Sequence, residues 1–306
     1  MLEILEPLRV ELGERIRRTL AGERPGSGAP AGAAGDIGLF GPGSATWEVH
    51  ADPALLVGGL RALLVQTLHP LAMAGVADHS TYRTDPLGRL HRTAAFVATT
   101  TFGSTVDADA AIERVRRVHA RVTGYAPDGR RYRADDPHLL GWVHATEVHS
   151  FLRAHQRYGA RPLAPGDDDR YVAEMASVGR RLGVVDPPRD VASLRATLQA
   201  YRPELVAGEQ AREAVRFLVW PPLPLTTRVP YGVVLAAAVA LLPPFARRLL
   251  RLPLAPLAEP VAIAPATTVL LRLMGWALGP HPAHHRRHER ALGDRLDPPR
   301  RGADGR

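Results

Sequence analysis

Apolar residues recur at intervals of three and four along most of the chain, which is the spacing of amphipathic α-helices. Acidic caps with proline in the first turn mark several helix starts, and glycine marks several ends. This pattern predicts helices over residues 52–70, 107–124, 135–159, 167–183, 191–206 and 209–220. Alternation of the strand type is confined to "DGRRYRA" at 128–134, which predicts a short hairpin. The chain is therefore expected to be all-α.

Shifts in composition divide the chain into three predicted parts. Residues 1–46 hold an amphipathic helix and a Gly- and Pro-rich loop, residues 47–280 hold the run of helices, and residues 281–306 form a basic polar tail. Two apolar runs lie near the end, at 231–244 and 260–279. Prolines cut the first and an arginine interrupts the second, so both are expected to be buried core helices rather than membrane spans.

The basic side chains are all arginine, and the formal net charge is +8 over 306 residues. This composition is typical of a GC-rich genome, and the arginines are scattered, so the charge is not taken as a sign of nucleic-acid binding. The absence of cysteine excludes disulfides, thiolate nucleophiles, iron–sulfur clusters and cysteine-ligated zinc or haem. The N-terminus lacks the layout of a secretory signal, so a cytoplasmic protein is expected.

Two histidines lie on faces that their predicted helices bury. The two stripes are Ile112, Val115, His119 and Val122, and Leu140, His144, Val148 and Phe151. A buried histidine is usually a hydrogen-bonded core residue. The two helices contain no His-Glu-x-x-His motif, since His149 follows His144 by five positions with Glu147 between them. A lone imidazole entering an apolar cavity is also what a proximal haem ligand requires, so both readings stay open.

The segment "GRLHRTAAFVATTTFG", residues 88–103, opens with a polar cluster and continues with small and apolar side chains. On a helix Arg89, Arg92, Thr93 and Phe96 share one face. A solvated surface turn has the same spacing. The spacing alone therefore assigns no function to the cluster.

Five segments between Trp47 and Glu174 carry a resemblance to a known family. They are "LVQTLHPLAMAGVADHS", "DPLGRLHRTAAFVATTTFGS", "VRRVHARVTG", "YRADDPHLLGWVHATEVHSFL" and "DDRYVAEM", in that order. Together they resemble the bacterial and fungal oxygenases that include the latex clearing protein, a rubber oxygenase, and the oxygenase of the mycophenolic acid pathway. The resemblance implies an all-helical, globin-like bundle with a cavity for haem b, on which dioxygen is activated.

The same resemblance implies roles for individual residues. Arg89 and Thr93 would lie around the haem, His119 would be the proximal iron ligand, and His144 is the second candidate. In the rubber oxygenase a lysine precedes the threonine and can close the distal side, whereas Arg92 occupies that position here. A guanidinium stays protonated, so Arg92 cannot ligate iron, although it can donate hydrogen bonds to dioxygen or to a substrate carboxylate or phosphate.

Three functions are compatible with these observations. The leading one is a haem b-dependent oxygenase, in which His119 binds the iron and Arg89, Arg92 and Thr93 serve dioxygen and a small or lipid-like organic substrate. The second is a non-catalytic helical protein that binds an apolar ligand or contacts a membrane peripherally through the arginines of residues 247–251. The third is a haem-free metalloenzyme. Its ligands would be His69, His79, His119 and His144 with Asp78.

Overall fold

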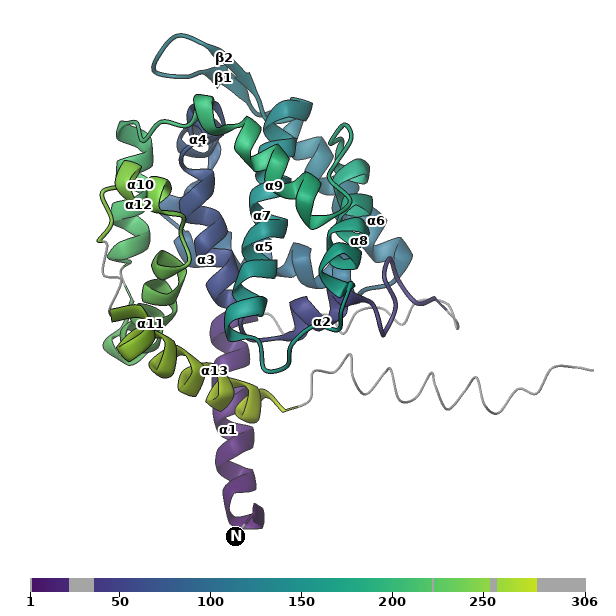
Figure 1. The fold of residues 1–306 in the computed structure, drawn as a ribbon, viewed down its shortest axis with the longest axis vertical. Coiled ribbons are helices and arrows are strands. Elements are labelled where there is room, and N and C mark those ends of the chain that lie inside the picture. Colours follow the sequence, from purple (N-terminus) through teal and green to yellow (C-terminus); the bar gives the residue numbers. More distant parts are fainter. Residues whose placement is uncertain (1, 22–35, 222, 254–257, 280–306) are drawn as a thin grey trace, which may run out of the picture.

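The computed structural model describes residues 2–21, 36–221, 223–253 and 258–279, and this part of the chain is all-α (Figure 1). Most of the predicted Gly- and Pro-rich loop and the basic tail at 281–306 lie outside the described residues. The helices are α1 Leu2–Ala21, α2 Ala45–Ala51, α3 Leu55–Gln66, α4 Pro70–His79, α5 Pro86–Phe102, α6 Thr105–His119, α7 Pro137–Tyr158, α8 Asp167–Leu182, α9 Val191–Ala200, α10 Glu209–Val219, α11 Leu225–Ala240, α12 Pro244–Leu249 and α13 Ala264–Leu278.

Short elements join the helices. One 3₁₀ turn at Thr81–Arg83 (η1) precedes α5, and another at Arg202–Glu204 (η2) follows α9. A π-helical turn at Glu259–Ile263 (η3) leads into α13. The predicted hairpin is confirmed: β1 Thr123–Tyr125 pairs antiparallel with β2 Arg131–Arg133 and projects from one end of the molecule (Figure 1).

Some predicted helix boundaries match the capping residues and others do not. The helix predicted over 191–206 ends at Ala200 as α9 and is followed by η2. The helix predicted over 135–159 is confirmed as α7, because the Asp136 carboxylate accepts the His138 N–H at 2.9 Å and the chain leaves the helix at Gly159. The start predicted at Asp52 is wrong, since Asp52 ends α2 and its carboxylate accepts the Ala54 N–H in a turn. The helix predicted over 107–124 stops at His119 because the residues beyond it pair in the hairpin.

The contact between α3 and α7 is the most extensive between helices in the described part, and the two helices run through the middle of the molecule (Figure 1). Gly58 makes this contact close: a Cβ at that position would lie 2.9 Å from the Phe151 Cα. The buried Arg61 guanidinium donates to Ser150 Oγ at 2.6 Å and to the Leu241 carbonyl at 3.0 Å. It thereby joins α3 to α7 and to the end of α11.

The C-terminal end of α5 is fixed by a buried polar contact. His50 on α2 places its Nδ1 2.7 Å from Thr101 Oγ1 and its Nε2 3.1 Å from the Tyr171 hydroxyl on α8. Burial, with a smaller effect of the nearby His155, lowers the pKa of His50 to about 3, so the ring is neutral. These contacts anchor α5 at one end, while its other end begins beside η1.

The last helix departs from the expectation of a buried core helix. One side of α13 is buried through Ala264, Thr267, Leu271 and Ala277, whereas Val261 and Val269 are 77% and 68% exposed. Glu259–Leu278 is long and apolar enough to cross a membrane by length and composition, and 22% of its most apolar stretch is buried. The expectation failed because hydropathy along a sequence does not specify how much of a helix its neighbours cover.

Candidate functional site

The polar cluster of residues 88–103 lies on α5, immediately after η1. The Asp85 carboxylate caps the helix by accepting the Gly88 N–H at 2.9 Å. Arg92 donates to the same carboxylate at 3.2 Å and to Thr81 Oγ1 at 2.8 Å, and its side chain is 61% exposed. The Thr93 hydroxyl donates to the backbone carbonyl one turn back, at 3.2 Å. Arg92 and Thr93 are therefore satisfied locally, at the surface of α5.

Arg89 differs from its neighbours on α5. Its side chain is partly buried, and burial together with the charge of Arg92 lowers its pKa. Within the described residues its guanidinium has no hydrogen-bond or salt-bridge partner. A desolvated, unpaired cation lacks the anion that normally compensates its burial. This position therefore favours an anionic group of a ligand.

The side chains of residues 92–95 are all exposed. Four successive positions point in all directions around a helix, because each residue turns it by about 100°. These four positions of α5 are therefore exposed among the described residues. Thr93 belongs to this exposed segment, and the partly buried Arg89 lies three residues before it.

His119 is the last residue of α6, the helix that packs against α5. The imidazole is half-buried, and burial lowers its pKa, although the Asp135 carboxylate opposes the shift. Among the described residues no side chain or carbonyl forms a hydrogen bond with the ring. A neutral imidazole without a partner has a lone pair available for a ligand.

His144 is buried on α7 and faces a helix backbone. An ideal Cβ at Gly179 on α8 would lie 2.9 to 3.1 Å from three atoms of the His144 ring, Nε2 among them. Burial, with a smaller effect of Arg180, lowers its pKa to about 4. Its Nε2 has no hydrogen-bond partner in the described part of the chain. The glycine therefore makes room for this imidazole at the contact between α7 and α8.

The ligand set considered for a haem-free metalloenzyme is not brought together in the described structure. His79 Nε2 lies 3.2 Å from the Thr123 carbonyl, and Asp78 accepts the Tyr132 hydroxyl at 2.5 Å, so both contact the hairpin. His119 and His144 lie on other helices. His69 alone belongs to a cluster of potential metal ligands, with partners that the sequence did not indicate.

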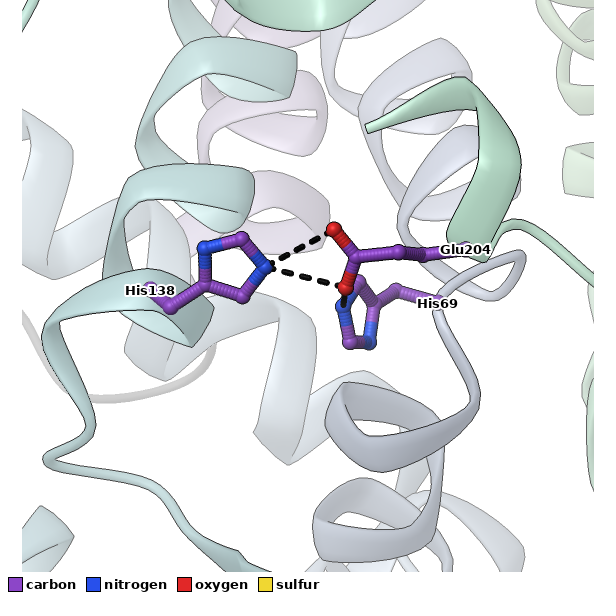
Figure 2. A group of neighbouring side chains, drawn as sticks. All are labelled: His69, His138 and Glu204. Carbon is purple, nitrogen blue, oxygen red and sulfur yellow. Dashed lines mark hydrogen bonds and ion pairs between the residues drawn. The ribbon is translucent and has the colours of Figure 1, made fainter. Parts of the chain in front are cut away.

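That cluster consists of His69, His138 and Glu204 (Figure 2). His138 Nε2 lies 2.9 and 3.0 Å from the two carboxylate oxygens of Glu204, and His69 Nε2 lies 3.3 Å from one of them. Burial lowers the pKa of His69, with the charge of Glu204 opposing. Burial alone would raise the pKa of Glu204, but the two imidazoles outweigh it, so the net shift is downward.

Glu147 on α7 is a second feature that the sequence did not assign. Its side chain is partly buried, and burial raises its pKa to about 7. The apolar stripe of α7 gave no sign of this, because Glu147 lies beside the stripe rather than on it. A carboxyl group that titrates near neutrality is suited to proton transfer.

A family model described as "ER-bound oxygenase mpaB/B'/Rubber oxygenase, catalytic domain" matches residues 47–278. The chain belongs to this family. Its fold is therefore that of an oxygenase catalytic domain, and the resemblance inferred from the five segments is confirmed. Comparisons with curated proteins and with solved structures gave no match.

Proposed function

We propose that this mpaB/rubber-oxygenase family member is a haem b-dependent oxygenase that uses dioxygen to oxidise a small or lipid-like organic substrate. The proposal rests on the family match together with one structural observation. Two neighbouring helices, α5 and α6, each present a desolvated polar group, Arg89 and His119, whose side chain has no hydrogen-bond or ion-pair partner among the described residues. A prosthetic group with an iron centre and anionic side groups would satisfy both.

His119 is the better candidate for the axial ligand of the two histidines. Its ring is half-buried and has no partner among the described residues, whereas the ring of His144 packs against the backbone at Gly179. For His144 to reach an iron, α7 and α8 would have to separate, since interiors are close-packed. His119 lies at the end of α6, where a ring can reorient without moving a helix. We therefore assign the iron to His119.

The α5 residues have complementary roles in this proposal. When bound, the haem supplies the iron on which dioxygen is activated. Arg89 would pair with a haem propionate or with a carboxylate of the substrate, and Thr93 would donate its hydroxyl toward the open side of α5. Arg92 can donate to dioxygen or substrate once it releases Asp85, its partner in an exposed and therefore weak ion pair, and Thr81, which accepts a hydrogen bond from it.

Haem content tests the assignment directly. Full-length protein produced with sufficient haem precursor should show the Soret band of haem b. The variant His119→Ala should lose stable haem binding, whereas His144→Ala should retain it with an altered spectrum. His79→Ala, which replaces an exposed histidine of α4, is the matched control and should be unchanged. A colourless protein that does not take up added haemin would refute the haem proposal. Loss of haem in His144→Ala alone would reverse the ligand assignment.

We further propose a cytoplasmic protein that contacts membranes peripherally through its C-terminal helices. The exposed apolar side chains Val261 and Val269 support this, as do the exposed arginines Arg248 and Arg251. Binding to anionic vesicles should fall as salt rises, because headgroup contacts are screened over about 8 Å at physiological ionic strength. Val269→Asp should weaken binding at every salt concentration. A protein that high salt does not release from membranes and that only detergent extracts would contradict a peripheral contact.

A further inference from the structure

Three separate parts of the chain contribute one donor each to the cluster of His69, His138 and Glu204 (Figure 2). His69 precedes α4, His138 lies in the first turn of α7, and Glu204 ends η2. A backbone hydrogen bond of 2.8 Å from the Val206 N–H to the Leu68 carbonyl joins the segments that carry His69 and Glu204. The approach of these two residues therefore does not depend on their own side chains.

Aromatic side chains hold the two imidazoles. The Tyr201 hydroxyl donates to the His138 carbonyl at 2.7 Å, and the Tyr201 ring centre lies 4.6 Å from that of His138. The His69 ring is 1% exposed and lies within about 6 Å of the Trp142 and Tyr201 rings. In metal sites, neighbouring side chains that contact the ligand residues typically hold each imidazole ring in the orientation that coordination needs.

We propose that His69, His138 and Glu204 bind one divalent transition-metal ion of the zinc class. Their donor atoms lie within 4.8 Å of one another. For bonds of about 2.0–2.1 Å, the edge of a tetrahedron is about 3.3 Å. The separations of 2.9 and 3.3 Å from the Glu204 oxygen to the two Nε2 atoms are close to that edge. Two imidazoles and a carboxylate leave a fourth position for water, as in zinc sites with three protein ligands.

Metal binding changes the tautomer of both imidazoles without releasing a proton. Without an ion, the Nε2–H groups of both rings donate to the Glu204 carboxylate. Coordination needs the Nε2 lone pairs, so the remaining ring proton moves to Nδ1. In His69 the Nδ1 atom lies 3.5 Å from the Ala72 N–H, at the outer limit of a hydrogen bond. The metal thus replaces one weak helix cap and two hydrogen bonds to a carboxylate.

The cluster is accessible from solvent on one side. The His138 and Glu204 side chains are 53% and 37% exposed, so an ion can enter without unfolding. A surface cavity of about 280 Å³ borders the site, lined by His138, Tyr201, Gly141 and Val185 among others. The fourth coordination position is therefore within reach of a small molecule, and the site is separate from the proposed haem ligand His119.

Zinc binding to the full-length chain tests the proposal, with one precaution. The tail carries His281, His284, His285 and His288, whose imidazoles are a second set of potential zinc ligands. All measurements therefore use a full-length background in which these four residues are replaced by glutamine. Zinc affinity and stoichiometry are measured by competition with a chromophoric chelator and by elemental analysis after dialysis. In that background the variants His138→Ala and Glu204→Gln are compared with the control His79→Ala.

One equivalent of zinc should remain in the background and in the His79→Ala control. Its affinity should fall at least about a hundredfold in His138→Ala and in Glu204→Gln, since loss even of outer partners costs 10- to 100-fold. Both changes are at partly exposed positions, and far-UV circular dichroism of the metal-free variants checks the fold. The cluster would be only a hydrogen-bond network if the tail-substituted protein bound no zinc, or if His138→Ala and Glu204→Gln still bound one zinc per chain with unchanged affinity. Haem content is independent of either result.

Discussion

The close contact of α3 with α7 yields a prediction that can be worked out from two adjacent glycines. At Gly58 an added Cβ would lie 2.8 Å from Phe151 Cδ1, 2.9 Å from Phe151 Cα and 3.1 Å from the Ser150 carbonyl oxygen. At Gly59, on the same helix, nothing lies within 4 Å of the added carbon. The replacement Gly58→Ala therefore inserts a methyl group against backbone, and Gly59→Ala inserts it into open space.

The two substitutions change the free energy of unfolding equally through helix propensity, and they differ in the cost of overpacking. Replacing glycine by alanine inside a helix favours the fold by about 0.5–1 kcal/mol at either position, because alanine restricts the unfolded chain. Overpacking at Gly58 costs about 1–3 kcal/mol, since the contacted atoms of Phe151 and Ser150 belong largely to the backbone and cannot rotate away. The helix contribution cancels between the variants. Gly58→Ala should thus be less stable than Gly59→Ala by about 1–3 kcal/mol.

Thermal and urea unfolding followed by circular dichroism measure this difference. For a domain of this size 1 kcal/mol corresponds to about 2–4 °C, so the melting temperatures of the two variants should differ by about 2–12 °C. Gly59→Ala should melt at or above the native temperature. Equal melting temperatures for the two variants would refute the close approach of α3 to α7 at this point, and so would a higher temperature for Gly58→Ala.

Two further predictions concern titration and coordination. Burial raises the pKa of Glu147 to about 7, so as the pH rises from about 4.5 the unfolded chain ionises first and the native state loses about 1.4 kcal/mol per pH unit until pH 7. Glu147→Gln should therefore gain stability relative to the native protein between pH 5 and pH 8 in urea titrations, and a constant gap would contradict the raised pKa. In haem-loaded protein, Arg92→Lys should shift the ferric spectrum toward a low-spin form as pH rises, because a lysine amine turned toward the iron can lose its proton and coordinate, whereas a guanidinium cannot. An unchanged spectrum would place residue 92 away from the iron.

Acidic capping residues and terminal glycines in the sequence correctly predicted the ends of several helices. Asp136 and Gly159 bound α7, and Gly183 ends α8 with a left-handed backbone, as the punctuation of the chain indicates. The same rule failed at Asp52, where the identical signal of an acid followed by proline makes a turn between two helices. A capping residue specifies that backbone N–H groups are satisfied nearby, and a turn can satisfy them as well as a helix.

The candidate metal cluster was beyond the reach of sequence reasoning for a different reason. His69, His138 and Glu204 are more than sixty residues apart at each step, so no spacing relates them. These residues approach one another because the chain after η2 lies against the segment before α4. A backbone hydrogen bond from the Val206 N–H to the Leu68 carbonyl joins the two segments. Only the tertiary path of the chain brings such residues together.

The two histidines on apolar stripes show what a burial pattern leaves undecided. The stripe containing His144 is buried at all four positions, whereas His119 keeps partial exposure. Burial by itself favours neither a structural nor a ligand role, since both need a neutral ring in dry surroundings. The group opposite the ring separates them: for His144 it is the α8 backbone at Gly179, whereas no described residue hydrogen-bonds to the imidazole of His119. Gly179, three residues before the end of α8, therefore bears on the choice of axial ligand as directly as the two histidines do. A Cβ at Gly179 would displace the His144 ring, so Gly179→Ala should lower stability while leaving haem content unchanged if His119 is the ligand.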